Sequence, residues 1–184
     1  MSAPLVVVAL RQEAAYLVDQ PGLDVLLTGI GKVSASFAVA TAFAERRPSR
    51  VLNVGTAGAL HDGLEGVHRI GRVIEHDLDH EALEALVGEP VPGAIVLDPD
   101  AEMVLATGDT FVQHPDLRRA LARRAHLVDM EGYAVARACQ AAGIPCEIVK
   151  VVSDDASEAA AHSWQETMDT MARLIAEVVA TTLA

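Results

Sequence analysis

Two acidic segments in the second half of the chain carry residue types that could bind a ligand. Residues 129–131 (DME) lead directly into a helical pattern, and residues 153–155 (SDD) follow an almost continuous apolar run at 148–152. Such a run is typical of a strand covered on both faces. Carboxylates at the carboxyl end of a buried strand lie where α/β sheets place their ligands. The two segments are therefore predicted to form one functional site.

Each carboxylate also has a simpler explanation when it is taken alone. Glu131 would complement the N-terminus of the helix that follows it. Asp154 and Asp155 would cap the loop after the strand. The grouping of the two segments, together with the rest of the chain, favours the site over these explanations.

The elements that must position these residues alternate between strands and helices. Because helical connections join successive strands, the predicted fold is a three-layer α/β/α arrangement around a mixed, largely parallel sheet. At this length, residues 1–184 are expected to form a single domain. Strands are predicted at 5–10, 23–28, 51–54, 67–75, 94–97, 103–107 and 148–152. Helices are predicted after 32, at 81–87, at 117–124, after 131 and from Ser163 onward. Ser163 and Glu166 have the spacing of a capping box at the start of the last helix.

Composition excludes several classes of partner. The chain is 51% hydrophobic but only 3% aromatic, so its core is built from Val, Ala, Leu and Ile. The formal net charge of −12 argues against nucleic acid or an anionic membrane, because both need a positive field. Cys139 and Cys146 lack metal-ligand spacing and are predicted to be reduced core thiols. No leader peptide and no membrane span is recognised, so a cytoplasmic protein is expected.

The glycine-rich segment 29–32 (GIGK) resembles two phosphate-binding motifs and matches neither. A P-loop requires Ser or Thr after the lysine, where Val33 stands. A dinucleotide fingerprint requires an acidic residue about 20 positions later, in a region that holds Arg46, Arg47 and Arg50 here. What remains is that Gly29 and Gly31 allow the backbone to approach a bound group before a helix N-terminus.

Metal and nucleophile motifs are also not supported. Residues 76–80 (HDLDH) fit no standard zinc spacing and are predicted to be a solvated surface. No histidine stands beside a Ser or Cys in a recognisable nucleophile motif, so a hydrolase triad is not indicated. Neither a metal nor an organic cofactor is expected.

Five separated segments resemble the purine nucleoside phosphorylase and nucleosidase superfamily, and most of all its bacterial 5′-methylthioadenosine/S-adenosylhomocysteine nucleosidases. They occur in the family's order, span nearly the whole chain, and are specific as a set although each alone is weak. The resemblance implies a nucleoside phosphorylase-like fold and cleavage of a purine–ribose bond. The segments are VALRQE (8–13), TGIGKVSAS (28–36), LNVGTAGAL (52–60), ATGDTFV (106–112) and VDMEGYAVARACQAAGIPC with VVSDDA (128–146 and 151–156).

The resemblance implies which residues do the chemistry. Cleavage leaves a cation-like ribosyl group and a negatively charged base, so a general acid at N7 accelerates it. In the family the aspartate of a Ser-Asp pair is this acid, which here is Asp154, oriented by Ser153. Its pKa must then be raised, and burial with Glu13 and Glu131 nearby would raise it. Glu13 matches the carboxylate that polarises the attacking water.

The resemblance also implies which residues bind the substrate. Glu131 matches the carboxylate that accepts hydrogen bonds from the ribose 2′- and 3′-hydroxyls, and Phe111 resembles the ring that stacks on the purine. Gly31 is expected to lie against the ligand through its backbone. The other binding residues pack on the sugar, read the base edge through their backbone, or form the turn beside the nucleophile: Met130, Val112, Thr56, Ala57 and Gly58.

Two positions discriminate within the superfamily. Many phosphorylases carry an arginine where Asn53 stands, and only Lys32 and Arg11 are basic around the expected anion pocket, so water is favoured over phosphate. A carboxyl at Asp154 suits an aminopurine. The prediction is hydrolysis of adenine-type, 5′-substituted nucleosides. The alternatives are a phosphorylase that uses the Gly29–Gly31 turn and Lys32 for phosphate, and an inactive nucleoside-binding homologue.

The chain departs from the family at three places. Residues 80–93 form a shorter stretch than in typical nucleosidases, in a region that helps form the 5′-substituent pocket and the subunit contact. Lys150 replaces a common arginine, and Leu10 stands where a methionine often lies. The resemblance therefore leaves the 5′ group open, and a homodimer is expected from the family.

Overall fold

The computed structural model describes residues 3–157 and 160–184, except for the side chains of 160–166. Within this part of the chain, nine strands form one sheet. Its main path runs in the order β2 (Val25–Leu27), β1 (Leu5–Val8), β3 (Val51–Ala59), β8 (Leu127–Asp129), β7 (Val104–Thr107), β5 (Arg72–Glu75) and β6 (Ala94–Val96). β9 (Cys146–Asp154) pairs with β3 and with β4 (Val67–Arg69).

The sheet is mixed and largely parallel, as predicted. The pairs β1–β2, β1–β3, β3–β9, β5–β7 and β7–β8 are parallel. The pairs β3–β8, β4–β9 and β5–β6 are antiparallel. The long β3–β9 pair is the centre of the fold, because both strands are nine residues long and lie side by side from Val51 to Gly58.

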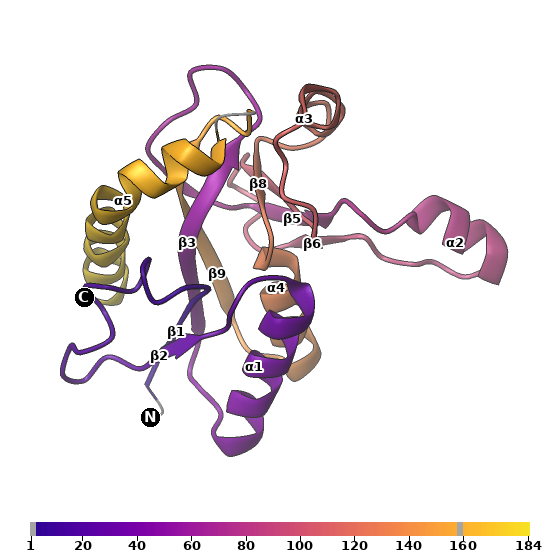
Figure 1. The fold of residues 1–184 in the computed structure, drawn as a ribbon. Coiled ribbons are helices and arrows are strands. Elements are labelled where there is room, and N and C mark those ends of the chain that lie inside the picture. The colour runs from indigo at the N-terminus through magenta and orange to yellow at the C-terminus, as the bar shows by residue number, and fades with distance from the viewer. Residues whose placement is uncertain (1–2, 158–159) are drawn as a thin grey trace.

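Helices cover both faces of the sheet, which confirms the three-layer prediction (Figure 1). α5 (Ala160–Leu183) lies on one face, and α1 (Lys32–Glu45) lies with α4 (Gly132–Ala142) on the other. The period-two alternation of β1 explains this. Val6 and Val8 pack in one core cluster with Ile175 of α5, whereas Leu5 and Val7 pack with residues of α1 and α4.

Two short helices lie outside these layers. α3 (Pro115–Ala122) precedes β8, and α2 (His80–Val87) projects away from the sheet at the end of an arm (Figure 1). All of α2 is described, and none of its residues is buried. Within the described part of the chain, no helix is both long and apolar enough to cross a membrane.

The predicted turn at residues 55–58 is wrong, because β3 continues through Thr56, Ala57 and Gly58 to Ala59. β9 pairs with this stretch, so the partner strand overrides the local preference of the glycines. The glycines instead allow side chains to approach closely. A Cβ on Gly55 would lie 3.2 Å from Glu13 Oε1, and one on Gly58 would lie 3.0 Å from Asp154 Oδ1.

Three other element predictions differ from the structure. The single strand predicted at 67–75 is two strands, because β4 pairs with β9 whereas β5 pairs with β6 and β7. β8 was not predicted as a strand, and its three residues are too short to show a period. α5 begins at Ala160 and not at Ser163, while the predicted capping pair of Ser163 and Glu166 lies outside the described side chains.

Candidate active site

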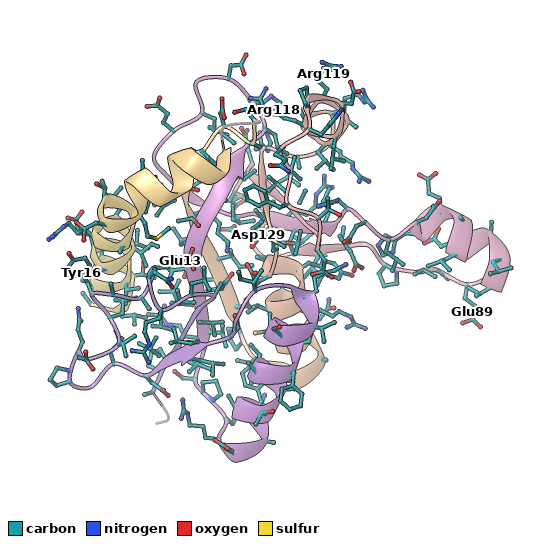
Figure 2. All side chains as sticks on the ribbon, viewed as in Figure 1. Glu13, Tyr16, Glu89, Arg118, Arg119 and Asp129 are labelled. Carbon is teal, nitrogen blue, oxygen red and sulfur yellow. The ribbon has the colours of Figure 1, made fainter. Side chains whose placement is uncertain are left out.

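A cavity of about 340 Å³ lies among the carboxyl ends of β1, β8 and β9 and the second half of β3. Its size is within the range of small-molecule sites. Figure 2 shows two of its acidic residues, Glu13 and Asp129, in the interior, whereas Glu89 lies at the tip of the arm. The predicted site residues that line the cavity are Glu13, Thr56, Ala57, Gly58, Phe111, Val112, Met130, Glu131, Ser153 and Asp154.

Gly31 is the one predicted site residue that does not line the cavity. Its backbone N–H donates to Glu131 Oε1 at 2.8 Å, so it supports a cavity residue and does not face the space itself. Ile30 is the residue of the glycine-rich segment that lines the cavity.

Glu13 is held in one orientation by three donors. Its Oε1 accepts hydrogen bonds from Thr56 N at 2.7 Å and Thr56 Oγ1 at 2.8 Å, and its Oε2 accepts one from Leu10 N at 3.1 Å. The side chain is buried at the cavity wall. A carboxylate has about four lone-pair sites, so these bonds leave room for roughly one more donor, such as a water molecule.

The end of β9 contains an irregularity that brings two neighbouring residues to the cavity. Val152 pairs with Ala57 and Asp154 pairs with Gly58, so Ser153 is the extra residue of a β-bulge. Successive strand residues normally point to opposite faces, and a bulge re-aims them. Both Ser153 and Asp154 therefore line the same cavity.

The carboxyl group of Asp154 is both hydrogen-bonded and partly buried. Oδ2 accepts from Ser153 Oγ at 2.8 Å, and Oδ1 accepts from Ala156 N at 2.9 Å. Burial raises the pKa of Asp154 above its ordinary value, although these two bonds oppose the shift, and repulsion from Asp155 adds to it. The raised pKa and its main cause, burial, agree with the sequence prediction, whereas the repelling carboxylate is Asp155 and not Glu13 or Glu131.

Asp129, and not Glu131, satisfies the N-terminus of α4. Asp129 Oδ2 accepts from Gly132 N at 2.8 Å, whereas the side chain of Glu131 makes no capping bond. Glu131 does stand at the N-cap position of α4, next to the helix N-terminus that the simpler explanation has it complement, but its side chain makes no capping hydrogen bond. The corresponding explanation of Asp154 and Asp155 is correct in part, because each accepts a backbone N–H from the loop that follows.

Glu131 has the most strongly perturbed acidity in the cavity. Burial raises its pKa, repulsion from Asp129 raises it further, and the pKa reaches about 7. Attraction to Lys150 and the hydrogen bond from Gly31 N oppose this shift, while Glu13 adds to it. Glu131 therefore changes its charge close to neutral pH.

Lys150 is a cavity residue whose role the sequence analysis missed. Its Nζ lies 2.8 Å from Asp129 Oδ2, with side-chain exposures of 3% and 2%. Burial disfavours the charged lysine, but Asp129 and Glu131 outweigh burial, and the pKa of Lys150 is raised. A single cation inside the apolar run 148–152 is the signal that could have identified it.

Lys32 and Arg11, the basic residues expected around an anion pocket, do not line the cavity. Lys32 Nζ instead bonds to Glu75 Oε1 at 2.6 Å and to Asp77 Oδ1 at 2.5 Å. Lys150 is thus the only cation among the described residues that line the cavity. The expectation of an anion pocket around Lys32 is therefore corrected.

Asn53 lines the cavity and carries a buried acceptor. Its Nδ2 donates to Val7 O at 3.0 Å, while its Oδ1 is buried and has no hydrogen-bond partner among the described residues. A buried acceptor without a partner is costly unless a ligand or water donates to it.

Metal ligands are not grouped in the described part of the chain. No set of three or more His, Cys, Asp or Glu side chains there is placed to hold an ion. In the histidine-containing segment 76–80, Asp77 accepts hydrogen bonds from Lys32 Nζ and Asp109 N, and His80 Nδ1 lies 3.2 Å from Val91 O.

Comparison with known proteins identifies a matching family and similar enzymes. The family model of the phosphorylase superfamily matches residues 73–184. The 5′-methylthioadenosine/S-adenosylhomocysteine nucleosidase of Geobacillus kaustophilus is 30% identical over 187 aligned positions, which cover 86% of this chain and 78% of the relative.

Solved structures share the fold. A mutant of the Helicobacter pylori nucleosidase MTAN, with 5′-methylthioadenosine in its active site, superposes with a TM-score of 0.89 at 22% identity, covering 98% of this chain and 97% of that chain. The futalosine hydrolase of the same organism superposes with a TM-score of 0.83 at 24% identity, covering 97% and 95%. At these identities the matches show the fold, whereas the family rests on the sequence matches. The chain belongs to the phosphorylase superfamily.

Proposed function

We propose that this chain hydrolyses the N-glycosidic bond of adenine-type, 5′-substituted nucleosides to the free purine and a ribose derivative. The observation that carries the proposal is the charge of the cavity. Four carboxyl groups line it (Glu13, Asp129, Glu131 and Asp154), and the only described cation there, Lys150, is already paired with Asp129. Such a cavity suits a ribosyl group that becomes positive in the transition state. The matched relatives named as nucleosidases support the same activity.

Asp154 is the general acid in this proposal. Its raised pKa keeps a proton on the carboxyl group at a higher pH than is usual for aspartate. The hydrogen bonds to Ser153 Oγ and Ala156 N fix its orientation, so a proton can be delivered to N7 of the departing purine. Protonation at N7 removes the negative charge that would otherwise build up on the base.

Glu13 polarises the attacking water, and Glu131 holds the ribose. Support for Glu13 comes from its fixed orientation, with about one lone-pair site left for a water molecule. Glu131, in its ionised form, accepts the 2′- and 3′-hydroxyls and places a negative charge near the developing cation.

Phe111 and Val112 bind the base. Phe111 is 44% exposed although it lines the cavity, so part of its ring is free to stack on a purine. Val112 is buried beside it and offers its backbone groups to the edge of the base. Met130 packs on the sugar, and Thr56, Ala57 and Gly58 line the side from which water attacks.

Phosphorolysis is the less favoured alternative. Its phosphate site would use the Gly29–Gly31 turn and Lys32, but Lys32 is neutralised by Glu75 and Asp77 and Gly31 N is bonded to Glu131. A dianion entering the carboxylate-rich cavity would be repelled.

We also propose a homodimer and a cytoplasmic location. Val33 and Phe37 on α1 are 79% and 75% exposed, and exposed apolar side chains of this size often mark subunit contacts. Sedimentation analysis of the purified chain tests the dimer, and fractionation of the source cells tests the location.

Base release from a nucleoside panel tests the proposed reaction. Adenosine, inosine, 5′-methylthioadenosine, S-adenosylhomocysteine and a 6-oxopurine futalosine are each incubated with and without phosphate. Adenine release without phosphate is the expected result. Release only with phosphate would assign the phosphorylase, and binding without release would assign the inactive homologue.

A further inference from the structure

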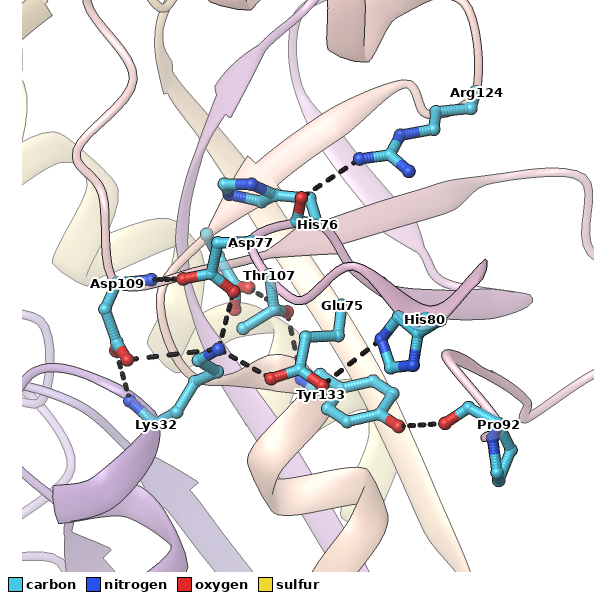
Figure 3. Close-up of polar contacts among 11 residues, drawn as sticks. Lys32, Glu75, His76, Asp77, His80, Pro92, Thr107, Asp109, Arg124 and Tyr133 are labelled. Atoms are coloured by element: carbon cyan, nitrogen blue, oxygen red, sulfur yellow. Dashed lines mark hydrogen bonds and ion pairs between the residues drawn. The ribbon is translucent and has the colours of Figure 1, made fainter. Parts of the chain in front are cut away.

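A group of charged residues outside the cavity connects two of the segments that line it. We call it the Lys32 cluster; it consists of Lys32, Glu75, Asp77 and Asp109 (Figure 3). Lys32 Nζ lies 2.6 Å from Glu75 Oε1, 2.5 Å from Asp77 Oδ1 and 3.9 Å from Asp109 Oδ2. Three carboxylates therefore surround one ammonium group.

The backbone takes part in the same cluster. Asp77 Oδ2 accepts from Asp109 N at 2.7 Å, and Asp109 Oδ1 accepts from Lys32 N at 2.8 Å. Burial disfavours ionised Asp77, but its bonds to Lys32 and Asp109 outweigh burial and lower its pKa. The cluster is thus a closed ring of bonds between the start of α1 and the loops after β5 and β7.

Two of the segments that the cluster joins, residues 29–31 and the loop after β7, reach the cavity. Asp109 stands two residues before Phe111, and Lys32 follows Ile30 and Gly31. Phe111 and Ile30 line the cavity but are only partly buried, so few core contacts hold them. Gly31 N, next to Lys32 N, donates to Glu131 Oε1. Bonds in the Lys32 cluster therefore set the positions of the base-binding and ribose-binding sides of the cavity.

We propose that Lys32 is a positioning residue for nucleoside binding, whose ammonium group holds the 108–112 loop and the 29–31 segment together over the cavity. This inference rests on the proposed function. Lys32 touches no reacting atom, so it acts through Asp77, Asp109 and the backbone between them. Without the ammonium group, three carboxylates face one another and repel, and the two segments move apart.

Lys32→Met is the first test, scored by the kinetics of adenine release. Stacking on Phe111 acts in the ground state and in the transition state alike, so its loss raises KM and leaves kcat nearly unchanged. We expect KM to rise roughly tenfold, which corresponds to a loss of about 1.4 kcal/mol of binding free energy. Lys32→Arg keeps the cation and should restore most of the affinity, which loss of fold stability alone would not predict.

Arg46→Met is the matched control. Arg46 lies at the other end of α1, where it forms an ion pair with Asp24 away from the cavity. Its removal also takes one cation from the end of the same helix, yet KM should stay at the wild-type value. If Lys32→Met does not fold, Asp109→Ala replaces it, because Asp109 is half exposed and its loss opens the same ring of bonds.

Amide hydrogen exchange provides a readout that does not depend on activity. The N–H groups of Gly31, Lys32 and Asp109 are each bonded to a carboxylate, so Lys32→Met should speed exchange in peptides that contain them, while β9 stays protected. Wild-type KM together with wild-type exchange in Lys32→Met would overturn the proposal. If the wild-type chain releases no base from any nucleoside, the proposed hydrolysis is rejected and the exchange rates alone decide the role of Lys32.

Discussion

The chain contains two lysines, Lys32 and Lys150, and both pair with carboxylates but in different surroundings. Each ammonium group lies among carboxylates. Lys150 and its partner Asp129 are 3% and 2% exposed inside the cavity wall, whereas Lys32, Glu75 and Asp77 are 17%, 13% and 23% exposed outside it. Burial shields the Lys150–Asp129 pair from screening by dissolved ions, whereas such ions can screen the interactions of Lys32 with Glu75 and Asp77.

The two locations correspond to different roles, because Lys150 influences the acidity of the cavity and Lys32 positions the loops beside it. Lys150 affects the acidity of the cavity, because it opposes the rise in the pKa of Glu131. Lys32 does not line the cavity, and its bonds end on the loops beside it. Changes inside the cavity should therefore affect turnover, stability or the pH dependence of binding, whereas changes in the Lys32 cluster should affect substrate affinity alone.

Asp154→Asn should have the largest effect on turnover. Asparagine keeps the shape of the side chain but cannot supply the proton, so kcat should fall roughly 10²–10⁴-fold while the melting temperature changes little. Asp19→Asn is the control, because Asp19 is exposed and does not line the cavity. Full activity of Asp154→Asn would remove the basis for assigning turnover to the cavity.

Lys150→Met should have the largest effect on stability. It leaves Asp129 buried without its cation, which typically costs about 3–5 kcal/mol in the free energy of unfolding. Adding Asp129→Asn removes the uncompensated charge and should recover much of the loss. Urea denaturation measures the unfolding free energy of the single and the double variant. If Lys150→Met lowers this free energy no more than Lys32→Met does, the distinction between the two lysines is contradicted.

The pH dependence of KM should report Glu131. Ionised Glu131 accepts the ribose hydroxyls, and its pKa of about 7 means that it loses this charge just below neutrality. KM should therefore rise as pH falls through 7, by up to about tenfold per unit. Glu131→Gln should raise KM and abolish this dependence, which assays from about pH 5.5 to 8.5 can resolve.

The stability linkage of Glu131 has the opposite sign. Its folded-state pKa of about 7 lies above the ordinary 4.5, so the folded chain binds this proton more tightly than the unfolded chain does. The contribution of Glu131 to stability should decline as pH rises through that window, while affinity improves. Denaturation of wild type and Glu131→Gln across the same range checks the sign.

Salt should have the smallest effect and should act through Lys32. Raising the ionic strength from about 0.1 to about 1 M shortens the screening length from about 10 Å to about 3 Å. The partly exposed Lys32 cluster should weaken and KM should rise roughly twofold, while kcat stays constant because the Lys150 pair is buried. In Lys32→Met the same salt should instead lower KM, because it screens the repulsion among the three remaining carboxylates.

Residues near strand ends were predictable from the sequence, and their partners were not. The acidic segments at 129–131 and 153–155 follow from local patterns, and the family motifs add Glu13 and Phe111 in register. The pairing of Lys150 with Asp129 and the bonds of Lys32 to Glu75 and Asp77 join residues 21 to 45 positions apart in the chain. No local pattern specifies such partners, so Lys32 was expected at an anion pocket and Lys150 was missed.

The sequence by itself determined the alternation of strands and helices, the mixed sheet, the family and half of the residues that line the cavity, because apolar periodicity and short motifs are local properties. Tertiary structure alone decided that 55–58 is strand and not turn, that a bulge at Ser153 brings two residues to one cavity, and which lysine lies inside it. Those outcomes depend on what a neighbouring strand or loop places beside a residue, and the resulting burial raises the pKa of both Asp154 and Glu131.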